Sequence, residues 1–242
     1  MFQAEYLSLA LINQIVAGFA PHPMFYGVLD DDDDDSAYLV TEFVPISGQQ
    51  DAAAHASTPM HACVDQLALT RDGSLHKTSA MPSYAADDPW LAQIDGLALA
   101  DFATSNKGHS RGCYGFPCTT YCGATPQANT PCPDGWSVFW RDKRLRPLLA
   151  TLEHDQELNR LGHELMAMVP QIIGDDTLIT PSLIHGDLWS GNWGIRADTG
   201  EAVIFDPAMY FGHHEAEFGI INMFGGLYNG ARAMTRCIGI VR

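Results

Sequence analysis

Four polar side chains in the C-terminal third of the chain have the types and spacing that phosphoryl transfer requires. His185, Asp187 and Asn192 occur within one short stretch, and Asp206 follows after a strand pattern. The His-x-Asp-x-x-x-x-Asn spacing is that of a kinase catalytic loop, in which the Asp accepts the proton of the attacking hydroxyl and the Asn holds a magnesium ion. Asp206 falls where kinases place a second metal-binding residue. We therefore expect Asp187 to be the catalytic base, with Asn192 and Asp206 as ligands of Mg²⁺.

A β-hairpin is expected to bring these groups together. Residues 193–195 and 202–205 read as short strands, and residues 197–200 form a turn sequence between them. A hairpin at this turn places Asn192 opposite Asp206, within one residue. An amide oxygen and a carboxylate at one end of the hairpin suit Mg²⁺, a hard cation that prefers oxygen ligands. The alternative is a buried turn in which the two Asp residues cap backbone amides.

The composition indicates a globular protein and disfavours polyanionic partners. Of 242 residues, 46% are hydrophobic and 10% aromatic, which is enough to build a substantial core. The formal net charge of −16 argues against nucleic acid and anionic membrane surfaces, because phosphate recognition needs a basic surface. No run of about eighteen apolar residues predicts a spanning helix, and the first residues lack the basic and apolar regions of a signal peptide. We expect a cytoplasmic protein with no nucleic acid or membrane partner.

Two groups of potential metal ligands are weaker candidates. Four of the six cysteines cluster, but their spacings differ from paired Cys-x-x-Cys knuckles, so we expect reduced thiols rather than zinc ligands. These are Cys113, Cys118, Cys122 and Cys132. His213, His214 and Glu215 form the other group, but adjacent side chains on an extended chain point in opposite directions and do not easily share one ion. For the acidic pair Glu215 and Glu217, we expect a structural role that holds a helix start to the catalytic loop.

The first half of the chain predicts a helix, two strands and a long irregular segment. Apolar spacing predicts a helix over residues 5–16, and residues 24–29 and 38–44 read as strands. The acidic run at residues 30–35 is interpreted as a solvated loop between the strands. Residues 49–93 show no sustained period, so we expect a long loop or insert there.

Two amphipathic helices are expected just before the catalytic stretch. In residues 136–149 the apolar side chains are expected to face inward and the basic ones outward. The inward residues are Val138, Phe139, Leu145 and Leu149, and the outward ones are Arg141, Lys143, Arg144 and Arg146. Residues 155–169 predict a core helix with four apolar side chains inward. These are Leu158, Leu161, Leu165 and Met168.

With these motifs in view, the sequence resembles the fructosamine 3-kinase family, whose members are also called ketosamine or protein-ribulosamine 3-kinases. The most specific stretch is Leu183–Asn192, where Trp189 and Ser190 follow His-Gly-Asp-Leu. Other stretches similar to the family are Met1–Glu5, Tyr114–Phe116, Pro126–Asn129, Trp136–Phe139, Arg144–Leu145, Ile204–Ala208, Tyr210–His213, Glu215–Glu217 and Met223–Gly226. The resemblance covers roughly residues 1–48 and 96–228.

The resemblance implies an α+β, protein-kinase-like fold with ATP between two lobes. Residues 1–48 would form a partial N-terminal lobe of a helix, a hairpin and a hinge. Residues 49–95 would be the insert, and residues 96–242 would be a mainly helical catalytic lobe.

The resemblance also assigns residues to the nucleotide. Glu42, Phe43 and Val44 would be the hinge whose backbone binds adenine, and Glu5 would be the glutamate that pairs with a phosphate-binding lysine. The acceptor would be the 3-hydroxyl of a ketosamine, a ribulosamine or fructosamine, free or on a glycated protein lysine. Phosphorylation there makes the adduct unstable, which leads to protein deglycation. An acidic surface is compatible with the cationic amine of that adduct.

Two features depart from the family pattern. All three lysines of the chain follow Glu5, and no glycine-rich phosphate loop precedes it. The family also continues with helices beyond Gly226. We therefore expect a chain that is truncated at both ends and weakly active or inactive, because catalysis in this class depends on positioning and charge neutralisation.

Three other functions compete with this one. The first is a degenerate kinase fold that binds a nucleotide or a glycated protein without turnover. The second is a related phosphotransferase with an aminoglycoside or choline-like acceptor, which Trp189 and Ser190 disfavour. The third is metal-dependent hydrolysis by His185, Asp187 and His213.

Overall fold

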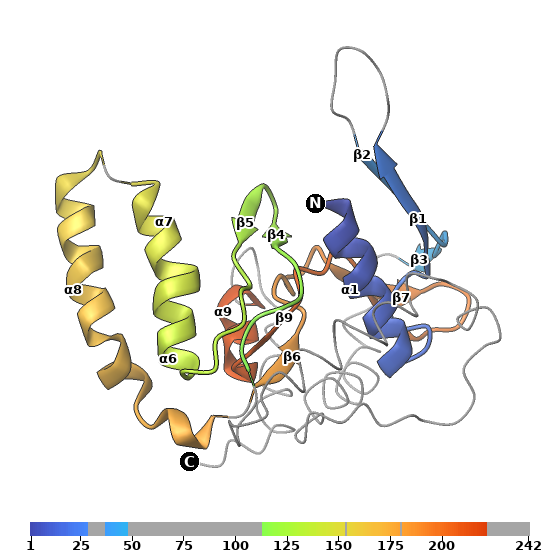
Figure 1. The fold of residues 1–242 in the computed structure, drawn as a ribbon. Helices are drawn as coiled ribbons and strands as arrows, with labels where there is room; N and C mark the ends of the chain where they lie inside the picture. The colour runs from blue at the N-terminus through green and yellow to red at the C-terminus, as the bar shows by residue number, and fades with distance from the viewer. Residues whose placement is uncertain (29–36, 48–112, 153, 180, 222–242) are drawn as a thin grey trace.

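The computed structural model describes residues 1–28, 37–47, 113–152, 154–179 and 181–221 (Figure 1). The predicted insert at residues 49–95 and the acidic run lie outside these ranges. Among the described helices, none combines the length and the apolar character needed to cross a bilayer.

The N-terminal segment consists of one helix packed on a hairpin. Helix α1 (Phe2–Ile15) contacts strands β1 (Pro23–Val28) and β2 (Ala37–Thr41), which pair antiparallel. The predicted helix and strands are confirmed with shifted ends. The helix begins at Phe2, and β2 ends at Thr41, before the stretch assigned to the hinge.

A three-stranded sheet joins this segment to the rest of the chain. Strand β3 (Ile46–Ser47) pairs with β7 (Trp193–Arg196), and β7 pairs with β8 (Ala202–Ile204), all antiparallel. The predicted β7–β8 hairpin is therefore confirmed, with its turn at residues 197–199. Phe19 adds a bond across the same region, because its carbonyl accepts from the N–H of Ile204 at 2.9 Å.

Two small antiparallel pairs flank the catalytic stretch. Strands β4 (Thr120–Cys122) and β5 (Thr125–Gln127) form a tight hairpin. Strand β6 (Ser182–Ile184) pairs with β9 (Tyr210–Gly212). The β6–β9 pair brackets the stretch from His185 to Asp206, since β6 runs directly into the loop that carries His185.

The helices formed by residues 136–150 and 156–173 lie together at the left of the molecule (Figure 1). Helix α6 (Trp136–Phe139), a π-helical stretch (Trp140–Leu145) and α7 (Arg146–Ala150) follow one another without a break. Pro147 lacks a backbone N–H, which fits the departure from regular α-helical bonding here.

Helix α8 (Gln156–Ile173) packs against that segment, and its first turn is capped by the Asp155 side chain, which accepts from the N–H of Leu158 at 2.9 Å. Shorter helical turns follow at η3 (Asp176–Leu178), η4 (His214–Ala216) and α9 (Glu217–Ile221).

The predicted inward face of α8 is wrong. The four leucine and methionine side chains assigned to the core are 40–50% exposed. Gly162, Met166 and Val169 are buried in their place. A Cβ on Gly162 would overlap the side chain of Leu149, so α8 and α7 approach at the glycine. The Leu149 side chain therefore packs on the α8 backbone at Gly162, and the face of Gly162, Met166 and Val169 is the buried one.

The core unites α1 with the β7–β8 hairpin. Leu9, Leu11 and Ile12 of α1 belong to the same buried cluster as Trp193 and Ile204 of the β7–β8 hairpin. Helix α1 and the catalytic segment are thus one packed unit.

The predicted outward orientation of Arg144 is also wrong. Its side chain faces inward rather than lying on a basic outer face. Its guanidinium lies over the rings of Phe139 and Tyr210, with 4.7 Å and 4.1 Å to the ring centroids. It also donates to the carbonyl of Ala128 at 2.9 Å and to Oδ1 of Asn129 at 2.6 Å. A planar cation can stack and bond along its edge at once, so the residue joins the helix, β9 and the base of the β4–β5 hairpin.

Replacement of Arg144 by Lys should therefore lower the free energy of unfolding by roughly 1–3 kcal/mol, because the ammonium cannot replace both the stacking and the forked bonds. Urea denaturation measures the loss. Arg146→Lys is the matched control, since Arg146 is an exposed residue of the same segment that pairs with Asp142. A control loss as large as that of Arg144→Lys would contradict the assignment.

Candidate active site

Asp187 lies in the loop after β6, with hydrogen-bond donors on both carboxylate oxygens. The thiol of Cys122 donates to Oδ1 at 3.4 Å, and Nδ2 of Asn192 donates to Oδ2 at 3.2 Å. Burial raises the pKa of the Asp187 carboxyl, these two donors lower it, and the nearby charge of Asp206 raises it further. The two carboxyl groups are therefore close enough to interact electrostatically.

The end of the β7–β8 hairpin brings Asn192 close to Asp206, as the spacing predicted. The N–H of Phe205 donates to the carbonyl of Asn192 at 3.1 Å, so Asp206 is one residue beyond the directly opposed position. Asp206 has a φ of 55° and is the one non-glycine residue with positive φ in the described ranges. Asp tolerates this left-handed conformation better than most residues, and its use here redirects the chain at the carboxylate.

His185 is a buried scaffold residue rather than a reacting group. Its Nε2 lies 3.1 Å from the carbonyl of Phe205, and its Nδ1 accepts from the N–H of Asp187 at 3.3 Å. This pairing requires a neutral ring that carries its proton on Nε2. Burial lowers the pKa of His185 to about 4. The imidazole therefore ties the loop of Asp187 to the chain just before Asp206.

Glu217 holds the same loop from the other side. Its buried carboxylate accepts from the backbone N–H groups of His185 at 2.7 Å, Gly186 at 3.2 Å and Leu188 at 3.3 Å. Burial raises the pKa of Glu217 to about 7, while the backbone donors favour its charged form. The predicted structural role is confirmed for Glu217.

Glu215, the other acidic residue of that pair, lines a cavity of about 380 Å³ instead. Trp136, Val169 and His213 are also among its lining residues, and Asp187, Asn192 and Asp206 are not.

A glycine is required in the middle of this loop. Gly186 has a φ of 82°, and a Cβ there would overlap the carbonyl oxygen of Ala208. The backbones approach this closely because the N–H of Ala208 donates to the carbonyl of His185 at 2.9 Å. The residues beside Asp187 and Asp206 are thereby clamped together.

Glu5 lies at the N-terminal end of α1 and faces the carboxylate of Asp206. Burial, together with the charge of Asp206 and a hydrogen bond to it, raises the pKa of Glu5 to about 7. The partner expected from the resemblance was a lysine. Lys143, the lysine within the described ranges, belongs to the helical segment after α6.

The residues predicted to form the hinge lie between β2 and β3, where the N-terminal segment joins the three-stranded sheet. The N–H of Glu42 is used by the carbonyl of His22 at 2.8 Å, and the Phe43 side chain is 88% exposed. Within the described residues, the N–H groups of Phe43 and Val44 donate to no backbone acceptor.

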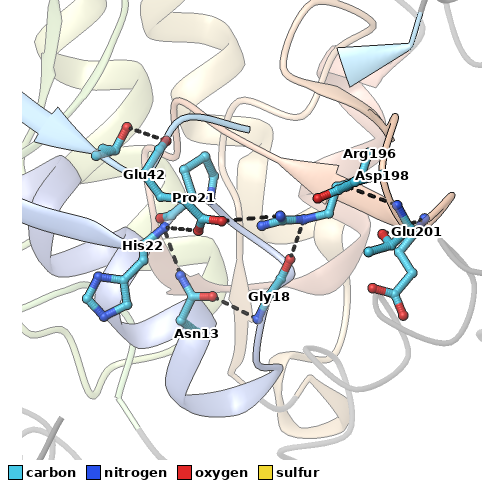
Figure 2. Close-up of polar contacts among 10 residues, drawn as sticks. Asn13, Gly18, Pro21, His22, Glu42, Arg196, Asp198 and Glu201 are labelled. Atoms are coloured by element: carbon cyan, nitrogen blue, oxygen red, sulfur yellow. Dashed lines mark hydrogen bonds and ion pairs between the residues drawn. The ribbon is translucent and has the colours of Figure 1, made fainter. Parts of the chain in front are cut away.

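The Glu42 side chain anchors this stretch to the catalytic segment (Figure 2). Its carboxylate accepts from the N–H of His22 at 3.2 Å and pairs with Arg196 of β7 at 3.3 Å. Arg196 also donates to the carbonyl of Gly18 at 3.3 Å, and the Asn13 side chain accepts from the N–H of Gly18 at 3.0 Å. The role of Glu42 visible in the structure is therefore to position the hinge.

Neither alternative metal group gathers three ligands among the described side chains. The imidazoles of His213 and His214 stack, with ring centroids 4.7 Å apart, and do not point in opposite directions as expected. The two side chains differ from the prediction for an extended chain because His213 caps the η4 turn, where its Nδ1 accepts from the N–H of Glu215 at 2.9 Å.

The donor set around Asp187 fits a magnesium ion. The amide nitrogen of Asn192 donates to the carbonyl of Asp187 at 2.9 Å and to its carboxylate, so Oδ1 is the atom of this side chain that could serve as a ligand. With the carboxylate of Asp206, the available donors are all oxygens, the ligand type that Mg²⁺ prefers.

Two contributors to this site were not assigned from the sequence. Cys122 was expected to be a reduced thiol rather than a zinc ligand, and Arg144 was expected on a basic outer face. Arg144 lies in a stretch similar to the family, but nothing local indicates its contacts with Asn129 and Tyr210. Cys122 comes to Asp187 from the β4–β5 hairpin, 65 positions away in the chain, so its contact has no local signal either.

The fold is that of a kinase-like protein. The family model for fructosamine kinases matches residues 94–231, more than half of the chain. The chain belongs to the fructosamine kinase family.

Curated relatives match parts of the chain. Ketosamine-3-kinase of Mus musculus is 37% identical over 116 residues, covering 47% of this chain and 36% of that protein. A probable ketoamine kinase of Vibrio cholerae is 33% identical over 187 residues, covering 70% of this chain and 62% of that one. The chloroplastic protein-ribulosamine 3-kinase of Arabidopsis thaliana is 38% identical over 128 residues, covering 52% and 38%. The chain spans less than two thirds of the length of these relatives.

Solved structures support the fold. Crystal structures assigned to fructosamine-3-kinases of Haemophilus somnus and Thermobifida fusca match with TM-scores of 0.67 and 0.64 and sequence identities of 16% and 21%. Each match covers 100% of this chain and 66% or 67% of the solved one. The α+β kinase-like fold expected from the sequence is confirmed.

The buried neutral His185 should make stability fall at acidic pH. Its pKa is lowered from 6.5 to about 4, so the unfolded chain binds a proton that the folded protein excludes. This contribution is complete above about pH 6.5 and is lost as the pH falls toward 4, with a size on the order of 3 kcal/mol. Denaturant unfolding at several pH values measures it.

His185→Asn should remove that slope as well as lowering the overall stability. Glu217 titrates in the opposite sense in both proteins, so the difference between their stability curves isolates the imidazole. Parallel curves between pH 4 and 6.5 would show that His185 is not excluded from protonation in the folded state.

Proposed function

We propose that this protein catalyses ATP-dependent phosphorylation of the 3-hydroxyl of ketosamines, the ribulosamine and fructosamine adducts, free or on glycated protein lysines. The observation that carries the proposal is Asp187, whose two carboxylate oxygens are held by Cys122 and Asn192 beside Asp206. Family membership supports the same reaction class. The product adduct is unstable, and the cellular result is protein deglycation.

The residues have separate tasks in this reaction. The Asp187 carboxylate takes the proton of the sugar 3-hydroxyl. The hydroxyl oxygen attacks the γ-phosphorus of ATP, and the bond from that phosphorus to the ADP oxygen breaks. Asn192 and Asp206 would hold Mg²⁺, which neutralises charge on the phosphates when bound. Phe43 and Val44 offer backbone groups to adenine, and Glu42 fixes that segment through Arg196.

A net charge of −16 suits this acceptor. A ketosamine carries a cationic amine next to the sugar, so an acidic protein attracts it and repels polyanions.

The second candidate function is nucleotide binding without turnover, and the position of Glu5 favours it. In the described residues the Glu5 carboxyl meets Asp206 rather than an ammonium group. Without a cation at that point, less charge is neutralised on the transferring phosphoryl group. The polypeptide of 242 residues would then bind ATP while transferring phosphate slowly.

Substitution of Asp187 by Asn should decide between these functions. If Asp187 is the base, Asp187→Asn lowers kcat by roughly 10²–10⁴-fold, because the proton of the acceptor hydroxyl has no carboxylate to receive it. The measurement is ATP-dependent phosphorylation of ribulosyl-lysine, followed by mass spectrometry, with Asp198→Asn in the exposed β7–β8 turn as the matched control. Wild-type nucleotide binding without product formation would establish the second candidate, and equal rates in wild type and Asp187→Asn would refute the first.

The oxygen donors should set the metal requirement. Asn192→Ala and Asp206→Asn are each expected to raise the Mg²⁺ concentration for half-maximal activity by about tenfold or more, because one ligand is removed. Titration of Mg²⁺ in the same assay, with ATP saturating, measures this shift. An unchanged Mg²⁺ midpoint in both variants would exclude these residues as ligands.

A further inference from the structure

The β4–β5 hairpin delivers a single side chain to the proposed catalytic base. Cys122 ends β4, and its Sγ lies 3.4 Å from Oδ1 of Asp187, within the normal range for a thiol donor. The two residues are 65 positions apart in the chain, so the contact is a product of the tertiary fold.

The turn after Cys122 is built to fix its direction. Gly123 has a φ of 57°, the conformation that a type II′ hairpin turn needs at its first central position. Cys122 and Thr125 pair directly across that turn, which leaves a two-residue loop. A short loop of this kind allows little movement of the strand end that carries the thiol.

The base of the hairpin is held as firmly as its tip. The buried Asn129 side chain donates to the carbonyl of Cys118 at 2.9 Å and to Oγ1 of Thr120 at 2.8 Å, closing the segment on itself. Its Oδ1 accepts from Arg144, which stacks on Tyr210 of β9. Because β9 pairs with β6, the hairpin and the Asp187 loop are fastened to the same two-stranded unit.

The thiol acts as a donor in this contact. Burial, followed by the charge of Asp187, raises the pKa of Cys122 to about 11, so its proton is retained at neutral pH. Asn192 occupies the other carboxylate oxygen at 3.2 Å. With one donor on each oxygen, the carboxyl plane cannot turn freely about its bond to the chain.

We propose that Cys122 is a positioning residue for the phosphoryl-transfer reaction, whose S–H···O bond sets the orientation of the Asp187 carboxylate. This role rests on the proposed function. It uses the thiol as a hydrogen-bond donor and involves neither zinc nor thiol redox chemistry.

The first test separates the donor from the volume of the side chain. Cys122→Ala removes the donor, and its kcat should fall about tenfold with KM for ATP unchanged, since a hydrogen bond to a charged group is lost. Cys122→Ser keeps a donor and should recover most of that loss. Cys118→Ala is the matched control, because Cys118 is a partly buried thiol of the same segment with no bond to Asp187. Wild-type kcat in Cys122→Ala, or equal losses in the Ala and Ser variants, would overturn the proposal.

The second test does not depend on phosphate transfer. Iodoacetamide alkylation of Cys122, followed by peptide mass spectrometry between pH 8 and 9, should be several-fold faster in Asp187→Asn than in wild type, because the carboxylate that retains the thiol proton is gone. The Cys118 rate should be the same in both proteins, which verifies the fold, and Asp187→Ser replaces Asp187→Asn if that check fails. Equal Cys122 rates would overturn the contact even in a protein without turnover, whereas faster alkylation in a chain that transfers no phosphate would remove the proposed function alone.

Discussion

The buried carboxylate of Glu217 and the backbone of the loop after β6 form the contact on which the candidate site depends. Consecutive N–H groups in a loop cannot pair with a neighbouring strand, and leaving them unpaired in the core would be costly. Glu217 accepts from three of them, at His185, Gly186 and Leu188. Asp187 is thereby left free to turn its side chain toward Asn192 and Cys122. One buried acidic residue thus holds the irregular loop after β6 in place.

Two further sets of contacts stabilise the surroundings of this loop. The neutral His185 joins the loop to the chain before Asp206, and Arg144 joins β9 to the base of the β4–β5 hairpin. Both side chains bond in two directions. As a result, groups from three separate chain segments meet with little freedom to shift, which is what a reaction governed by positioning requires.

The N-terminal segment is coupled to the β7–β8 hairpin through packing and one ion pair. Helix α1 shares the core with the β7–β8 hairpin, and Arg196 of that hairpin holds Glu42 beside the hinge. The same packing places Glu5 against Asp206. A shift of α1 would therefore act directly on the proposed metal ligand Asp206.

The sequence alone determined the features that depend on neighbours along the chain. The spacing of His185, Asp187, Asn192 and Asp206 and the turn between β7 and β8 are local, so the hairpin and its register could be predicted to within one residue. The kinase-like fold followed from the family motifs. The structure decided the features that depend on distant partners. Gly162 determined which face of α8 is buried, aromatic rings drew Arg144 inward, and the hairpin brought Cys122 to Asp187. Each of these results from contacts between segments far apart in the chain, where residue type and periodicity carry no information about the partner.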